Sequence, residues 1–162
     1  MNLHRDQGFT LLELLIVVLV IALVLAVSYP SLSRGSSSLH LRAAGRDVLN
    51  TFRYAREKAV TEQTAMMVTV DRDKQELVLS DSVGDGARRY LMPQDVKIHR
   101  MSLAGTEVMQ GQRPLVVRFL PNGSSDNAEV LLESGTGSLL RVITDPMTGG
   151  ARIETGQGEN FR

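Results

Sequence analysis

The sequence contains no cysteine and no tryptophan, and only 4% of its 162 residues are aromatic. Without cysteine, the chain can form no disulfide and offers no thiol for catalysis or for metal ligation. The lack of disulfides does not identify the compartment, because disulfide-free proteins also occur where conditions are oxidising. A chain of this length has room for one domain with one modest hydrophobic core.

An excess of charge is also missing, because 18 Lys and Arg residues balance 18 Asp and Glu residues. A neutral chain has no general attraction for nucleic acid, so we do not expect nucleic acid as a partner. The three histidines, His4, His40 and His99, have no companion at metal-ligand spacing. A phosphate-binding loop, a nucleophile elbow and an HExxH zinc motif are all absent. We therefore expect no enzyme activity, no catalytic residue, no metal site and no cofactor.

A long apolar run near the amino terminus is the strongest feature that is present. Over residues 9–29 the only polar side chains are Thr10, Glu13 and Ser28. As a helix this stretch would extend roughly 30 Å, about the thickness of one hydrocarbon core, so we expect a transmembrane helix there. Three interpretations are open: a plain anchor, a secretory signal cut after residues 26–28, or a membrane helix whose charged residue has a function.

Glu13 is the residue on which these interpretations differ. A carboxylate at the centre of a membrane helix costs roughly 2.5–3.5 kcal/mol on insertion scales. Glu13 lies near one end of the run, where its side chain could extend toward water and reduce this cost. One interpretation is therefore a tolerated polar residue at the membrane surface, and the other is a carboxylate that meets a cationic partner.

The stretch GFTLLE at residues 8–13, followed by the apolar run, resembles the processing site of the type IV pilin-like family, which includes the pseudopilins of type II secretion. In that family a prepilin peptidase cuts after the glycine that ends a short leader, and it methylates the new first residue, usually Phe. The resemblance implies a leader over residues 1–8, cleavage between Gly8 and Phe9, and N-methylation of Phe9. Helices of the family commonly carry a proline where this chain has Pro30, which implies a helix kink there.

The same resemblance gives Glu13 a function in assembly. Glu13 would be the fifth residue of the mature chain, and in the family this glutamate pairs with the amine of a neighbouring subunit. Residues four apart share a helix face, so Glu13 can also face the amine of its own chain. Such a pair attracts strongly where the dielectric constant is low, whereas an unpaired charge remains costly. We therefore expect Glu13 to be an assembly residue.

The segment after the apolar run can be interpreted in two ways. Residues 31–38, SLSRGSSS, are typical of a flexible linker, or they are a softened section of one long helix that Pro30 and Gly35 would bend. In addition, the three serines at 36–38 could cap a restarted helix. Over residues 39–62 the pattern is helical, with small or apolar side chains at steps of three and four residues: Leu41, Gly45, Val48, Phe52, Ala55 and Ala59. We expect this face to pack on a sheet of the same chain.

Beyond residue 64 the pattern changes to short apolar segments between glycine-rich turns. Strands are expected at 66–71, 75–80, 88–92, 95–101, 114–120, 128–134, 137–144 and 151–154. The expected fold class is α+β and pilin-like: a long N-terminal helix, with a transmembrane half and an amphipathic half, packed on a small antiparallel β-sheet or sandwich. The expected organisation is a leader (1–8), a transmembrane helix (9–29), a linker and amphipathic helix (30–62) and a periplasmic β-rich domain (63–162).

Three further stretches resemble the H-type minor pseudopilins and the related minor pilins. They are Arg-Tyr-Ala-Arg at 53–56, Phe-x-Pro-x-Gly at 119–123 and Pro-x-Thr-Gly at 146–149. In both turns glycine also has a backbone reason, because it permits a positive φ angle.

These resemblances imply a minor pseudopilin of the type II secretion system, a structural subunit of the periplasmic pseudopilus that helps to export folded proteins. The alternative is a minor pilin of a type IV pilus, which would serve assembly, adhesion, twitching or DNA uptake. In both cases the chain would cross the bacterial inner membrane once, with its C-terminal domain in the periplasm. The implied partners are other pilin or pseudopilin subunits, the prepilin peptidase, the inner-membrane assembly platform and membrane lipid.

Overall fold

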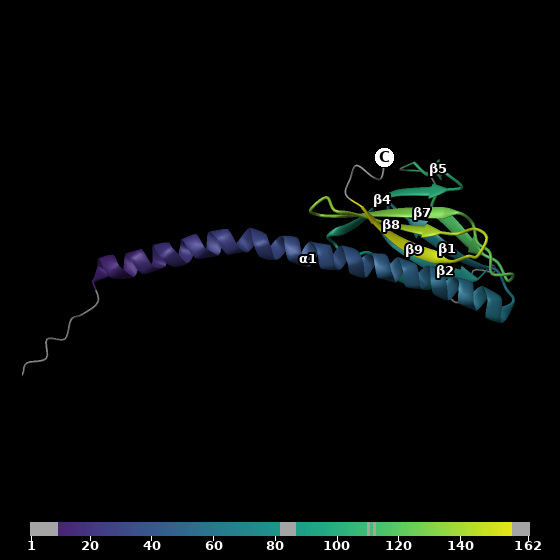
Figure 1. The fold of residues 1–162 in the computed structure, drawn as a ribbon, viewed down its shortest axis with the longest axis horizontal. Helices are drawn as coiled ribbons and strands as arrows, with labels where there is room; N and C mark the ends of the chain where they lie inside the picture. Colours follow the sequence, from purple (N-terminus) through teal and green to yellow (C-terminus); the bar gives the residue numbers. More distant parts are fainter. Residues whose placement is uncertain (1–9, 82–86, 110, 112, 157–162) are drawn as a thin grey trace, which may run out of the picture. The chain divides into compact units, whose positions relative to one another are not determined.

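The computed structural model describes residues 10–81, 87–109, 111 and 113–156, and it describes residues 26–35 by their backbone alone. These residues form one helix and nine strands (Figure 1): α1 (Leu11–Glu62), β1 (Met66–Asp71), β2 (Glu76–Asp81), β3 (Arg88–Leu91), β4 (Val96–Leu103), β5 (Thr106–Glu107), β6 (Leu115–Phe119), β7 (Ala128–Ser134), β8 (Leu139–Thr144) and β9 (Ala151–Gly156). The chain divides into two compact units, one that ends at Ser36 and one that begins at Ser37. The unit that holds all the strands therefore begins within α1.

Helix α1 is continuous through the segment for which the sequence allowed two interpretations. Residues 31–38 are helical, so the flexible-linker interpretation is wrong, and no new helix starts at the three serines. The kink at Pro30 stays a prediction. The helix ends at Glu62, and the next residue, Gln63, has a φ of 52°, the left-handed conformation that often follows a helix. Among the residues described here, no helix combines the length and the apolar character that crossing a membrane requires.

The amphipathic part of α1 packs on strands of its own unit, as the sequence predicted (Figure 1). The six apolar side chains on its inner face are at most 4% exposed: Leu41, Ala44, Val48, Phe52, Ala55 and Ala59. The rings of Phe52 and Phe119 lie 5.7 Å apart, so the helix and β6 share an aromatic contact. Complete burial of a side chain as large as Phe contributes about 1.5–3 kcal/mol, so this face holds the helix on the strands.

The strands form two antiparallel sheets rather than one. The first has the order β3-β2-β1-β6 and the second β5-β4-β7-β8-β9. Eight of the nine strands lie where the sequence predicted them, with ends that differ by at most two residues. The missed strand, β5, has two residues and is too short to show any alternation. The α+β fold with a small antiparallel sandwich is therefore confirmed.

Candidate functional site

The N-terminal part of α1 presents an apolar surface. Every side chain from Thr10 to Leu25 is exposed. Thirteen of them are large and apolar, with exposed fractions between 47% and 84%: Leu11, Leu12, Leu14, Leu15, Ile16, Val17, Val18, Leu19, Val20, Ile21, Leu23, Val24 and Leu25. A contiguous apolar surface of this kind marks a site of contact with another protein or with a membrane.

Glu13 lies in the first turn of this apolar helix. Its backbone N–H donates to Thr10 Oγ1 at 3.2 Å, so Thr10 caps α1. Thr10 and Glu13 have the Thr-x-x-Glu spacing of a capping box, in which the glutamate sits at the third helical position. A negative charge at a helix N-terminus is stabilised by about 0.3–1 kcal/mol. Glu13 therefore stabilises the first turn of α1, in addition to its predicted role in assembly.

The sequence interpretation missed Thr10, although the capping-box spacing was a visible signal. Of the other predicted site residues, Gly8 and Phe9 lie outside the described residues. Pro30 belongs to α1, where its backbone alone is described.

In the second unit, the three H-type motifs meet at Arg56. The Nε of Arg56 donates to the carbonyl oxygens of Thr148, at 2.7 Å, and of Gly123, at 3.2 Å. Both turn glycines have positive φ angles, 85° at Gly123 and 62° at Gly149, as the sequence predicted. A Cβ atom at Gly149 would overlap the carbonyl oxygen of Gly123. We call these four residues, Arg56, Gly123, Thr148 and Gly149, the Arg56 joint.

The turn on the C-terminal side of the joint is held by its own first residue. Asp145 Oδ1 accepts hydrogen bonds from the backbone N–H groups of Met147, at 2.9 Å, and Thr148, at 3.1 Å. The bonds from Thr148 and then Met147 lower the pKa of Asp145. The Asp145 carboxylate therefore satisfies two backbone N–H groups of the turn. The Met147 side chain of this turn is 86% exposed.

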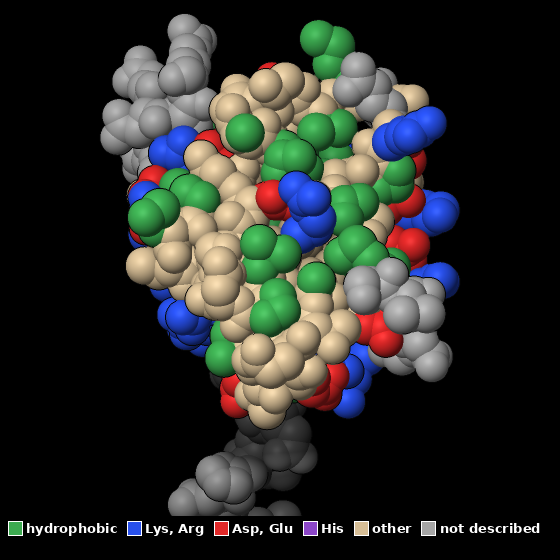
Figure 2. All heavy atoms as spheres, turned by 90° about the vertical axis from the view of Figure 1, so that its right-hand side faces the viewer, with side chains coloured by type: hydrophobic (Ala, Val, Ile, Leu, Met, Phe, Trp, Pro, Cys, Tyr) green, Lys and Arg blue, Asp and Glu red, His purple; other side chains and the backbone are tan. Residues whose placement is uncertain are grey.

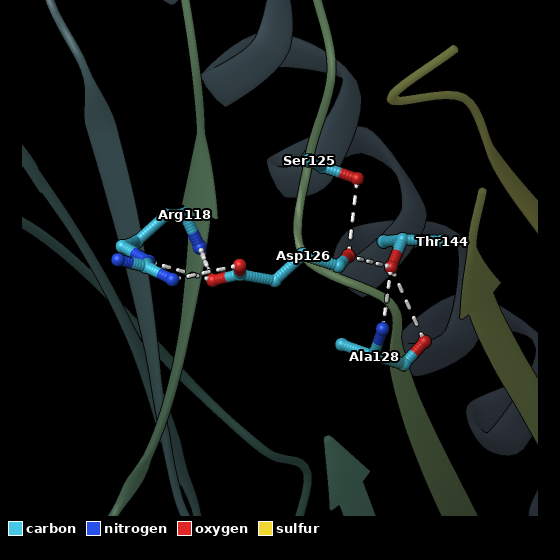
Figure 3. A network of polar contacts seen from close by, with 5 residues as sticks. All are labelled: Arg118, Ser125, Asp126, Ala128 and Thr144. Carbon is cyan, nitrogen blue, oxygen red and sulfur yellow. Dashed lines mark hydrogen bonds and ion pairs between the residues drawn. The ribbon is translucent and has the colours of Figure 1, made fainter. Parts of the chain in front are cut away.

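A second polar network connects three strands of the sandwich (Figure 3). Arg118 of β6 binds the Asp126 carboxylate through Nε at 2.9 Å and Nη2 at 3.0 Å. Burial alone would raise the pKa of Asp126, but the hydrogen bonds and the charge of Arg118 lower it overall. The hydroxyl of Thr144 donates to the Asp126 carbonyl oxygen and accepts from the Ala128 N–H, both at 2.7 Å. This network ties β6 to β7 and β8.

The charged side chains do not form a one-sign stripe on the face shown in Figure 2, where Lys and Arg alternate with Asp and Glu around hydrophobic side chains. In the part of the chain that the structure covers, no three His, Asp or Glu side chains are grouped so that they could hold a metal ion.

Residues 44–149 match the sequence profile of the family described as type II transport protein GspH. The chain belongs to this family. This match agrees with the resemblance of the three motifs to the H-type group. Residues 3–29 match a second profile, the prokaryotic N-terminal methylation motif. The GspH match includes the whole Arg56 joint, and the methylation match includes Gly8, Phe9 and Glu13.

Two solved structures of the minor pseudopilin EpsH from the type 2 secretion system of Vibrio cholerae have the same fold. The first superimposes with a TM-score of 0.61 at 11% sequence identity, and covers 74% of this chain and 97% of the other. The second gives a TM-score of 0.59 at 12% identity, and covers 74% and 96%. No curated relative matches the sequence significantly. The fold of the GspH family chain is thus shared with EpsH despite little sequence identity.

Proposed function

We propose that this GspH family chain is a structural subunit of a periplasmic pseudopilus and catalyses no reaction. Residues 9–29 would anchor it in the bacterial inner membrane, with the unit from Ser37 onward in the periplasm. The observation that carries the proposal is the apolar surface of α1 from Leu11 to Leu25. Lipid would cover this surface before assembly, and the helices of neighbouring subunits would cover it in the filament.

Processing at Gly8 and Phe9 is the second part of the proposal, and the match to the methylation motif supports it. A prepilin peptidase would cut after Gly8 and methylate the new amine of Phe9. The assembly platform of the inner membrane would then receive the subunit. In the filament, Glu13 would pair with the amine of a neighbouring subunit, so assembly would satisfy a charge that lipid leaves uncompensated.

The mature amino terminus tests the processing. Mass spectrometry of the protein purified from its native membrane is expected to find a chain that starts at methylated Phe9. A chain that starts near Tyr29 would mean an ordinary signal peptide and a soluble periplasmic protein, and both the filament and the role of Glu13 would then be wrong.

A deletion strain tests the type of filament. We expect the loss of type II secretion together with normal surface pili, because the chain belongs to the GspH family. Normal secretion with loss of pili, twitching or DNA uptake would instead favour a minor pilin, which shares the same processing site.

A further inference from the structure

A groove of about 610 Å³ lies beside the Arg56 joint, between the last turns of α1 and the turn that precedes β9. The residues that matter for its chemistry are Arg53, Arg56, Val60, Thr61, Gly149 and Gly150. On the turn side the groove is lined by Gly149, Gly150 and Ala151, so this side carries no charged side chain.

Two guanidinium groups line the groove on the helix side. Arg56 is held by its Nε, which leaves its two Nη atoms with no hydrogen bond to any residue in the described ranges. Arg53, one helical turn earlier, is exposed and forms no ion pair with a described residue. Glu57 is the one acidic side chain among the lining residues, so the groove carries an excess of positive charge.

The position of Arg56 favours binding of a carboxylate. A planar guanidinium matches a carboxylate with two parallel hydrogen bonds. Because the Arg56 side chain is already fixed by two backbone carbonyls, little further side-chain entropy is lost when it binds a ligand. The groove also contains an exposed apolar side chain on the same helix, Val60, at 39%.

We propose that this groove binds an acidic segment of a neighbouring subunit. An Asp or Glu side chain of that segment would contact Arg53 and Arg56, and an adjacent apolar side chain would contact Val60. The charge of the groove selects the acid, and Val60 presents the apolar contact. This inference rests on the proposed function, because the neighbour is taken to be another subunit of the same filament.

Site-specific photocrosslinking of the full chain in its own cells tests the groove. With p-benzoylphenylalanine in place of Thr61, we expect an adduct with another subunit, and the crosslinked peptide should contain Asp or Glu. Adding Arg53→Glu should reduce the adduct about five-fold or more, since an attractive charge pair becomes repulsive. The matched control is Arg42→Glu, an exposed arginine of the same helix that does not line the groove. Reversal of the partner's acid to Lys should restore the adduct of the Arg53→Glu chain.

Three results would overturn the inference. The first is an adduct that Arg53→Glu leaves unchanged, and the second is an adduct with lipid or nucleic acid. The third is the absence of any adduct in cells whose secretion depends on the chain. If deletion of the chain leaves secretion intact, the proposed function is wrong. This result does not depend on the crosslinking experiment, so the two failures can be told apart. Equal thermal melting of the Arg53→Glu and Arg42→Glu chains would exclude unfolding as the cause of a lost adduct.

Discussion

The side chain of Arg56 lies directly against Gly149, where a Cβ atom would come within 3.1 Å of Arg56 Cδ and 3.2 Å of Nε. The two residues are far apart in sequence, and each belongs to a different H-type motif. Through this contact the Nε of Arg56 reaches the carbonyl oxygens of both turns. The Arg56 joint thus fastens both turns of the sandwich to α1.

Gly149→Ala is expected to lower the free energy of unfolding by on the order of 2–4 kcal/mol, because it adds a steric overlap with Gly123 to the cost of a positive φ. The control is Gly137→Ala, at a φ of 79° with nothing within 4 Å of the new methyl group. There we expect only the conformational cost, about 1–2 kcal/mol. Urea denaturation of the full chain in detergent measures both, and equal losses would contradict the packing argument.

Arg56→Lys tests the hydrogen bonds of the joint. Lysine keeps the charge but has no Nε–H, so neither turn carbonyl would keep its present donor. We expect a loss of about 1–3 kcal/mol in the free energy of unfolding. Arg42→Lys, on the exposed face of the same helix, should change it by less than about 0.5 kcal/mol. Similar results for the two variants would mean that the charge of Arg56, and not its geometry, matters.

Gly45 allows α1 to approach β8, because a Cβ at this position would lie 2.5 Å from Leu140 Cδ2. Gly45→Ala gains about 1 kcal/mol in helix propensity but costs about 1–3 kcal/mol in overpacking, so we expect no net stabilisation. Leu140→Ala alone should cost about 2–5 kcal/mol. In the double variant the new methyl group fills part of the cavity, so the loss should be smaller than the sum. Additive losses in the same urea assay would contradict this contact.

Acid should weaken the network around Asp126. Because the folded protein lowers the pKa of this carboxyl, its contribution to stability is present above the unfolded value of about 3.9 and is lost as the pH falls through the folded pKa. We expect Asp126→Asn to cost on the order of 1 kcal/mol at pH 7, and the difference from wild type to shrink as the pH falls through the lowered pKa of Asp126. Asp73→Asn is the control, because the Asp73 carboxylate makes no hydrogen bond or ion pair with a described residue. A difference for Asp126→Asn that does not depend on pH would contradict the assignment.

Variants of Glu13 separate its charge from its place in the capping box. We expect Glu13→Ala and Glu13→Val to leave membrane insertion intact and to reduce incorporation into filaments on the order of ten-fold. Glu13→Gln is the informative control, because glutamine is accepted in a capping box but carries no charge. If the charge pair drives assembly, this variant should fail like the other two. Membrane fractionation measures insertion, and crosslinking to other subunits in intact cells measures incorporation. Normal incorporation of Glu13→Gln would leave only the helix-capping role.

The sequence alone predicted the inward face of the amphipathic helix and eight strands, and the structure confirms both, whereas the processing site stays a prediction. These features are local: apolar periodicity selects the buried face, and glycine marks the turns with a positive φ. The two open interpretations of residues 31–38 could not be resolved in this way. Serine, glycine and proline have low helix propensity, yet the segment is helical because it continues the helical turns on both sides.

Only the tertiary structure showed that the motifs at Arg56, Gly123 and Gly149 form one joint with a cationic groove beside it. Gly123 and Thr148 follow Arg56 by 67 and 92 residues in the sequence. No rule of sequence spacing predicts contacts over such separations, because the distance in space depends on how two sheets pack on one helix. The sequence determined which surfaces are apolar and where the chain turns. The packing of α1 on the strands decided which of those turns an arginine could reach.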